Sequence, residues 1–159
     1  MREPVAIEAT VRAAAAEETP AVAAAVARLL AELGGREPDR GELEAEVRAA
    51  LAEPQAASVL VAESSQGEIV GLLSASWLRA IHVPGAYGVI QDLWVEASWR
   101  SRGVGAQLVA AIAAEARERG AARLEVGLPR ETFAAIAATE SFYRANGFEH
   151  LGPRMRRLL

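Results

Sequence analysis

The sequence predicts an α/β fold, with helices flanking a mixed central sheet. The chain has 159 residues, the size of one compact domain, so we expect a single domain over residues 1–159. Residues 58–63 and 69–77 flank a polar turn that contains Gly67 and predict an antiparallel hairpin. A strand, an apolar helix and another strand follow over residues 89–128, the order of a parallel βαβ unit with a right-handed crossover.

The first half of the chain supplies a strand and two helices before the hairpin. Residues 7–13 alternate as a strand does. Thr19 is expected as the N-cap of a helix with Pro20 at its first position, and the paired glycines at 34–35 end that helix. Asp39 is expected to cap a second helix, which stops near Pro54.

The second half begins after a glycine-rich stretch around Gly85 and Gly88, which we interpret as a loop before a strand at 89–95. Apolar residues then recur four apart and predict a helix that ends at Gly120. A strand over 124–128, a helix over 133–146 and a last strand beginning at 148–151 complete the prediction.

Composition excludes several function classes. The formal net charge of −4 argues against a nucleic-acid binder with a broad basic face. The chain contains no Lys and no Cys, which excludes lysine or cysteine nucleophiles and thiolate metal sites, and its two His residues are few for a metal centre. No apolar run is long enough for a signal peptide or a membrane span, so we expect a soluble cytoplasmic protein without metal, nucleic-acid or membrane partners.

The segment at residues 100–106 (RSRGVGA) lies between the apolar strand and the apolar helix. The start of a helix leaves backbone N–H groups unpaired and carries partial positive charge. Glycines at this point let an anion approach the backbone, and Arg100 and Arg102 add charge of the right sign. The segment lacks the lysine of a P-loop and the third glycine of a dinucleotide fingerprint, so it predicts a phosphate site for another cofactor.

Two stretches resemble the GCN5-related N-acetyltransferase (GNAT) superfamily. Residues 89–106 (VIQDLWVEASWRSRGVGA) are similar to its core motif, in which an R/Q-x-x-G-x-G/A loop binds the pyrophosphate of acetyl-CoA. Residues 141–148 (SFYRANGF) are similar to its second motif, at the end of a later helix. The resemblance implies a GNAT-like fold whose parallel strands splay apart, acetyl-CoA as cosubstrate, and transfer of an acetyl group to a primary amine.

The resemblance also assigns roles to individual residues. The backbone of Leu93, Trp94 and Val95 would pair with the pantetheine arm of the cofactor in the gap between the splayed strands. The pyrophosphate would be bound by residues of the glycine-containing loop: Arg100, Arg102, Gly103, Val104, Gly105 and Ala106. Ile136 replaces an Asn that relatives often carry, which removes one expected cofactor contact.

Acyl transfer to an amine requires a proton acceptor for the amine and a donor for the leaving thiolate. Tyr143 matches the family's proton donor. Many relatives carry Glu or His where this chain has Gln91, which could only hold a water molecule that relays the proton. The neighbouring Asp92 is a candidate for binding the amine or for acting through water, but strict alternation would place it on the opposite face from Gln91 unless a bulge intervenes.

The acceptor remains open at this stage. A small-molecule or amino-acid-like amine is the leading hypothesis, and a protein N-terminus is an alternative. A non-catalytic acyl-CoA-binding or sensing module is a further alternative, for which Gln91 is the main argument. Family members are often dimers, so a homodimer is an option for which the sequence offers no separate evidence.

Overall fold

The computed structural model describes residues 8–159, and over these residues a five-stranded sheet is ordered as the chain runs, β1-β2-β3-β4-β5. Neighbouring strands are antiparallel except β4 and β5, which are parallel. This confirms the mixed sheet and the βαβ unit. The strands are β1 (Ala9–Ala13), β2 (Ala57–Ser64), β3 (Ile69–Ala80), β4 (Val83–Val95) and β5 (Leu124–Val126).

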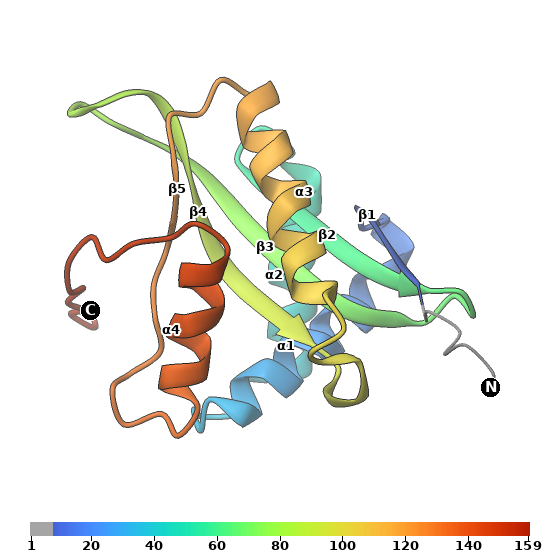
Figure 1. The fold of residues 1–159 in the computed structure, drawn as a ribbon. Coiled ribbons are helices and arrows are strands. Elements are labelled where there is room, and N and C mark those ends of the chain that lie inside the picture. Colours follow the sequence, from blue (N-terminus) through green and yellow to red (C-terminus); the bar gives the residue numbers. More distant parts are fainter. Residues whose placement is uncertain (1–7) are drawn as a thin grey trace, which may run out of the picture.

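Helices cover both faces of this sheet (Figure 1). α1 (Thr19–Glu32) and α2 (Arg40–Ala52) lie behind the sheet as drawn, whereas α3 (Val104–Glu118) and α4 (Ile136–Ala145) lie in front of it. Short 3-10 turns precede α1 and follow β4, at Ala16–Glu18 and Ala97–Trp99. The sheet is therefore the middle layer of the fold, and the loop after β4 leads directly into α3.

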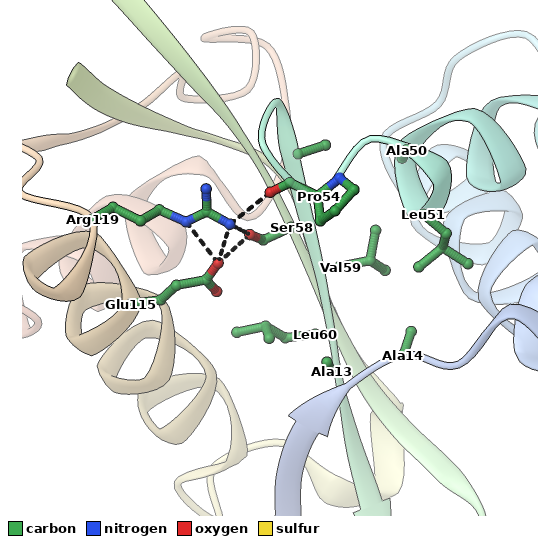
Figure 2. Close-up of a pocket in the computed structure, with 11 residues that line it drawn as sticks. Ala13, Ala14, Ala50, Leu51, Pro54, Ser58, Val59, Leu60, Glu115 and Arg119 are labelled. Carbon is green, nitrogen blue, oxygen red and sulfur yellow. Dashed lines mark hydrogen bonds and ion pairs between the residues drawn. The ribbon is translucent and has the colours of Figure 1, made fainter.

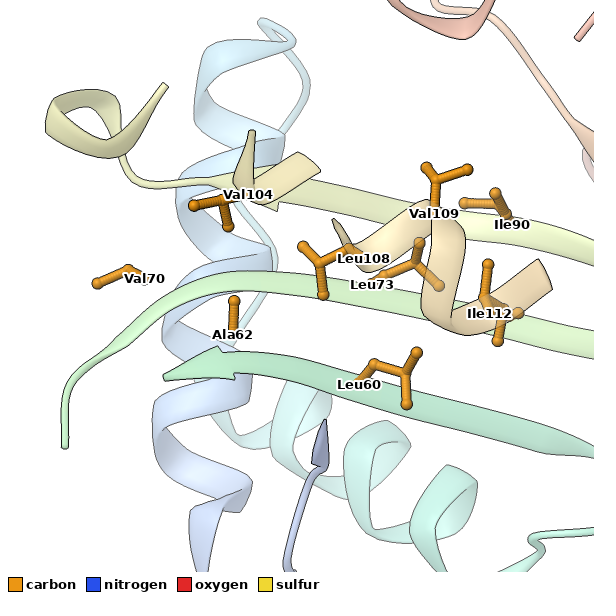
Figure 3. Packing of buried hydrophobic residues seen from close by; sticks show 10 residues of the cluster. Leu60, Ala62, Val70, Leu73, Ile90, Val104, Leu108, Val109 and Ile112 are labelled. Carbon is orange, nitrogen blue, oxygen red and sulfur yellow. The ribbon is translucent and has the colours of Figure 1, made fainter. Parts of the chain in front are cut away.

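The larger apolar core lies between the sheet and α3 (Figure 3). Leu108 and Ile112 of α3 are fully buried against Leu73 and Ile90 of the central strands. Burial of an aliphatic side chain of this size stabilises a fold by about 1.5–3 kcal/mol. These contacts fix α3 across β3 and β4, and they hold the beginning of α3 next to the end of β4.

A second core packs α1 and α2 against the other face, with Val22, Val47 and Trp94 among its buried residues. The Asp39 carboxylate accepts a hydrogen bond from the backbone N–H of Glu42 (3.1 Å), so the expected cap of α2 is confirmed. At α1 the prediction was wrong by one residue. Thr19 is already helical, because the 3-10 turn at Ala16–Glu18 leads directly into α1. Its hydroxyl therefore does not cap the helix and donates to the carbonyl of Ala16 (2.7 Å).

The glycine-rich stretch before residue 89 belongs to β4 and is not the predicted loop. Gly88 pairs with Trp77 in β3, and a Cβ there would lie 2.7 Å from the Trp77 ring and 2.6 Å from Leu124. The glycine is needed because these two side chains occupy the space above the strand.

The C-terminal segment differs most from the sequence prediction. α4 begins at Ile136, three residues after the predicted start, and ends as expected with Gly147 in the left-handed region (φ 89°). The predicted strand at 148–151 is absent, since residues 148–159 adopt no helix or strand. Phe148 instead closes the helix by donating its N–H to the carbonyl of Tyr143 (3.0 Å), and His150 contacts Glu140 (2.8 Å). Ile7, with which the first strand was predicted to begin, lies outside the described residues.

Candidate functional site

The loop at residues 100–106 turns the chain from β4 into α3 through two left-handed residues, Ser101 (φ 60°) and Gly103 (φ 86°). Left-handed backbone is strained for a serine, so Ser101 marks a position where the loop shape is imposed by its surroundings. Nothing lies within 4 Å of a Cβ placed on Gly103. Successive N–H groups in a backbone of this kind form a concave nest for an anion.

The backbone donors of this loop are unpaired. Gly103 is the N-cap of α3 and offers no side chain to the helix start. Within residues 8–159, none of the N–H groups from Ser101 to Ala106 donates to a protein acceptor, and the first paired donor is Gln107, bonded to the carbonyl of Gly103 (3.0 Å). The partial positive end of α3 and a row of free donors therefore face the same point.

The two arginines of the loop have different surroundings. Arg100 donates from Nε to the carbonyl of Val95 (2.8 Å) and from Nη2 to both carboxylate oxygens of Glu32 at the end of α1 (2.6 and 2.8 Å). Arg102 forms no ion pair or hydrogen bond with any described residue, and its guanidinium carbon lies 5.7 Å from the centroid of the Trp99 ring. Of these two arginines, only Arg102 leaves its charge uncompensated by a carboxylate.

Gly105, in the first turn of α3, brings the two sequence motifs together. A Cβ on Gly105 would lie 3.1 Å from two atoms of the Phe142 ring on α4 and 3.8 Å from a methyl group of Val95. The absence of a side chain thus lets α4 approach the helix start and the end of β4. The loop, the strand end and α4 meet at one place.

β5 is only three residues long, so β4 is paired with it over residues 88–90 alone. The register runs from Gly88 opposite Leu124 to Ile90 opposite Val126, after which β5 ends while β4 continues to Val95. The N–H of Glu96 donates to the carbonyl of Val70 in β3 (2.9 Å), so strand alternation turns the backbone groups of Trp94 toward β3 as well. The backbone groups of Leu93 and Val95 therefore point away from β3, into the gap beyond β5.

A bulge in β4 brings Gln91 and Asp92 to the same face of the sheet. Ser74 is opposite Asp92 and Ala75 is opposite Ile90, which leaves Gln91 as the extra residue. Ser74 donates its hydroxyl proton to Asp92, and the amide nitrogen of Gln91 donates to the hydroxyl of Ser76 (3.3 Å). The two serines are two apart in β3 and share a face, which is the face covered by α1 and α2.

The carboxyl group of Asp92 is partly buried. Burial raises its pKa above the ordinary value of 3.8, and the hydrogen bond from Ser74 opposes part of that rise. Gln91 is exposed. The pair therefore offers a shielded carboxyl group beside an accessible amide.

Tyr143 lies on α4 between two aromatic rings. Its ring centroid is 5.2 Å from that of Phe142 and 5.4 Å from that of Phe148, both in edge-to-face geometry. Burial raises the pKa of the phenol from 10.0 to about 12. No described residue forms a hydrogen bond with its hydroxyl group. The phenol therefore stays protonated at neutral pH and has a donor to offer.

A cavity of about 190 Å³ lies far from these residues, at the other end of α3 (Figure 2). Arg119 donates to Glu115 (2.9 Å) and to the carbonyl of Pro54 (2.7 Å), and Ser58 donates to Glu115 (2.5 Å). These polar groups satisfy one another and tie α3 to the chain between α2 and β2. In the described residues we find neither a cluster of His, Asp and Glu suited to a metal ion nor a helix capable of crossing a bilayer.

Three residues near the site were not found by sequence reasoning. Glu32 has no role in the sequence motifs, and nothing in the sequence connects it to Arg100, with which it forms an ion pair. Ser74 could have been found by aligning β3 with β4 as antiparallel neighbours, since Ser74 lies directly opposite Asp92. The left-handed conformation of Ser101 has no sequence signal, because serine does not favour it.

Comparisons with known proteins agree with this architecture. Residues 23–148 match the model of the Acetyltransferase (GNAT) family. A candidate acetyltransferase from Arthrobacter sp. FB24 is 25% identical, with a TM-score of 0.79 over 99% of this chain and 100% of that one. Glucosamine-6-phosphate N-acetyltransferase from Arabidopsis thaliana shares the fold at 15% identity, with a TM-score of 0.74 over 95% and 98% of the two chains.

The ribosomal-protein-alanine N-acetyltransferase of Brucella melitensis biovar Abortus 2308 also shares the fold, at 18% identity and a TM-score of 0.73 over 95% of this chain and 99% of that one. No curated protein sequence matches the chain. The Arabidopsis and Brucella proteins are named for different acceptors, so the common fold leaves the acceptor open.

Proposed function

The chain belongs to the GNAT family of acetyltransferases, and from this premise we propose that it transfers the acetyl group of acetyl-CoA to a primary amine of a small-molecule or amino-acid-like acceptor. Residues 1–159 would form one N-acetyltransferase domain. The proposal rests above all on the unpaired N–H groups from Ser101 to Ala106 at the start of α3.

The loop is suited to a pyrophosphate by its donors and by its free space. The left-handed Ser101 and Gly103 curve the backbone, and the space beside Gly103 is open to an incoming group. Donors of this kind bind anions at helix starts without a cationic side chain, and Arg102 adds one. We assign the pyrophosphate to the backbone N–H groups of Ser101, Arg102, Gly103, Val104, Gly105 and Ala106. The motif also includes Arg100, but its N–H already donates to the carbonyl of Ala97 (3.3 Å).

The gap beside β4 is suited to the extended arm of the cofactor. An unpaired strand edge offers N–H and C=O groups to amides as a neighbouring strand would. Leu93 and Val95 turn these groups into the gap, so we assign the arm to them and give Trp94 the task of keeping β4 paired with β3. An arm bound here would end near Gln91 and Asp92 at the bulge.

Acetyl-CoA would supply the acetyl group as a thioester, which a neutral amine can attack. The attacking nitrogen must lose a proton, and the departing sulfur must finally gain one, which gives an amide and free CoA. Asp92, whose pKa is raised by burial, is our candidate acceptor for the amine proton. Gln91 would position the water molecule or amine beside it.

Tyr143 is our candidate donor to the sulfur. Its pKa of about 12 lies well above the value of roughly 8.5 that is typical of a thiol. A phenol this weakly acidic gives up its proton reluctantly, so its main contribution would be a hydrogen bond to the developing thiolate. Asp92 faces α1 and α2, whereas Phe142 beside Tyr143 packs against the core under α3. The two groups would thus serve the acceptor side and the leaving-group side.

A non-catalytic acyl-CoA-binding module is the second candidate, favoured by one observation: the exposed side chain at the bulge is the amide of Gln91 and not a carboxylate. Two measurements separate the candidates. Calorimetric titration with CoA tests binding, and thiol release from acetyl-CoA over a panel of amino acids, amino sugars and polyamines tests transfer.

We expect CoA to bind with micromolar affinity and at least one amine to accelerate thiol release. Binding without acceleration by any amine would favour the module, and absence of CoA binding would contradict both candidates.

A further inference from the structure

Arg100 and Arg102 occupy neighbouring positions of the phosphate loop, and the family motif treats the first of them as part of the cofactor site. In the structure the guanidinium of Arg100 is turned toward α1, where Glu32 accepts two hydrogen bonds from Nη2. The carboxylate compensates the positive charge of Arg100 locally. This arrangement does not suit a side chain whose task is to attract phosphate.

The contacts of Arg100 join three elements at their ends. Glu32 is the last residue of α1, and Val95 is the last residue of β4, while Arg100 itself begins the loop that leads to α3. A guanidinium can serve three acceptors in fixed directions, which an ammonium group cannot do. Arg100 therefore fixes where the loop starts relative to α1 and to the strand edge at Val95.

The bond to Val95 has a second consequence. The carbonyl of Val95 points into the gap beside β4, and it already accepts the Nε–H of Arg100 (2.8 Å). In this arrangement, the backbone groups of Leu93 and Val95 that remain available to a ligand are the N–H of Val95 and the N–H and C=O of Leu93. Arg100 thereby defines the end of the strand edge that is available to a ligand.

Arg102, unlike Arg100, has no partner among the described residues that compensates its charge. Within residues 8–159 its guanidinium has no carboxylate or carbonyl partner, and its central carbon lies 5.7 Å from the centroid of the Trp99 ring. It is exposed and lies next to the unpaired N–H groups of the loop. Its charge is the one available to an anion bound at the start of α3.

Building on the proposed function, we propose that Arg100 is a positioning residue that holds the phosphate loop to α1 through Glu32 and to β4 through Val95, and that Arg102 is the side chain that binds the cofactor phosphates. Glu32 is then part of the cofactor site without touching the cofactor.

The test compares CoA with pantetheine, which has the arm but no pyrophosphate. Titration gives the Kd of CoA, and competition against CoA gives the Ki of pantetheine, for wild type, Arg100→Gln, Arg100→Lys and Arg102→Gln. Arg48→Gln is the matched control, because Arg48 pairs with Glu44 on the surface of α2, away from the loop.

We expect Arg102→Gln to raise the Kd of CoA about tenfold or more, the loss of a charge-assisted hydrogen bond, and to leave the Ki of pantetheine unchanged. Arg100→Gln should raise both constants by the same factor. Arg100→Lys should do the same, although it keeps the charge, because lysine cannot replace the fork of bonds to Glu32 and Val95.

The proposal is overturned if Arg100→Gln weakens CoA alone and Arg100→Lys restores it, since Arg100 would then bind phosphate. It is equally overturned if Arg102→Gln leaves CoA unaffected, or if Arg100→Gln leaves both constants unchanged. If wild type does not bind CoA, the proposed function fails by itself. The role of Arg100 is then decided by thermal unfolding of Glu32→Gln, Arg100→Gln and the double variant. The decreases in unfolding temperature of the two single variants must be non-additive in the double variant if Arg100 is held by Glu32.

Discussion

Gln91 and Asp92 show how one additional residue in a strand changes what a sheet face presents. In a regular strand the two side chains would point to opposite faces. The bulge at Gln91 places both beside the serines of β3, on the α1–α2 face. The sequence indicated only that a bulge would have this effect, because the register that creates it depends on the pairing of two whole strands.

The first prediction concerns the pH dependence of stability at Asp92. Burial raises the pKa of this carboxyl group in the folded protein, so the folded state is penalised once the group ionises. The penalty is absent below the unfolded pKa of about 3.9 and develops fully as pH rises through the folded value. Asp92→Asn should therefore raise the free energy of unfolding at pH 7 relative to wild type, and the difference should shrink toward pH 4.

Urea unfolding of both proteins between pH 4 and pH 8 measures this difference. Glu96→Gln is the control with the opposite sign, because hydrogen bonds from Ser98 lower the pKa of Glu96. Its removal should cost stability at pH 7 and progressively less toward pH 4. A stability difference at Asp92 that does not change with pH would contradict the account of its burial.

The second prediction concerns Tyr143. Tyr143→Phe keeps the edge-to-face contacts with Phe142 and Phe148 and removes only the hydroxyl group. We expect turnover to fall about 10²- to 10³-fold, as for loss of a hydrogen-bond donor to a developing negative charge, with the Kd of CoA unchanged. Thiol release with the best amine of the panel measures turnover. Full activity in this variant would remove Tyr143 from the mechanism.

Between elements, the contact between Gly105 of α3 and Phe142 of α4 links the two sequence motifs physically. Alanine at position 105 would favour the helix by about 0.5–1 kcal/mol, but overpacking against the ring costs about 1–3 kcal/mol. Gly105→Ala should thus reduce the free energy of unfolding by about 1 kcal/mol in wild type. In a Phe142→Leu background the same change should be neutral or stabilising, which urea unfolding of the four proteins tests. A Gly105→Ala protein more stable than wild type would contradict the packing seen here.

The elements with strong periodicity were predicted well. α3 follows from apolar spacing, because the residues of one helix face are buried against the sheet. The β2–β3 hairpin follows from two apolar runs around a polar turn, because helices bury both faces of these strands. The early part of β4 was missed because Gly88 resembles a loop residue. Its reason for being glycine is the pair of side chains above it, Trp77 and Leu124, which are distant in sequence.

The end of the chain was overpredicted for a related reason. Residues 148–151 were predicted to begin a strand, but the N–H of Phe148 donates to the carbonyl of Tyr143 in α4, and His150 bonds to Glu140. Local pattern cannot reveal such competition for hydrogen bonds. Likewise, the motif could place Arg100 in the phosphate loop, but its partner Glu32 is supplied by a helix 68 residues earlier in the chain.

At the scale of the whole molecule, the sheet order β1-β2-β3-β4-β5 and the position of α3 bring the motif loop, the open edge of β4 and α4 to one place. Residues 23–148, which match the GNAT family, include the motif loop, β4, α3 and α4. The site thus depends on the architecture as much as on the loop itself. Within this site, we propose that the free N–H groups at the start of α3 bind the pyrophosphate of CoA.

The most direct test is a titration of the ¹⁵N-labelled protein with CoA, followed by the amide signals in NMR. We expect the signals of Ser101, Arg102, Gly103, Val104, Gly105 and Ala106 to shift on binding and to saturate with the Kd found by calorimetry, while those of α2 do not move. Pantetheine should leave the signals of the loop nearly unchanged and shift those of Leu93 and Val95. Saturation with CoA that leaves the loop amides in place would contradict the account.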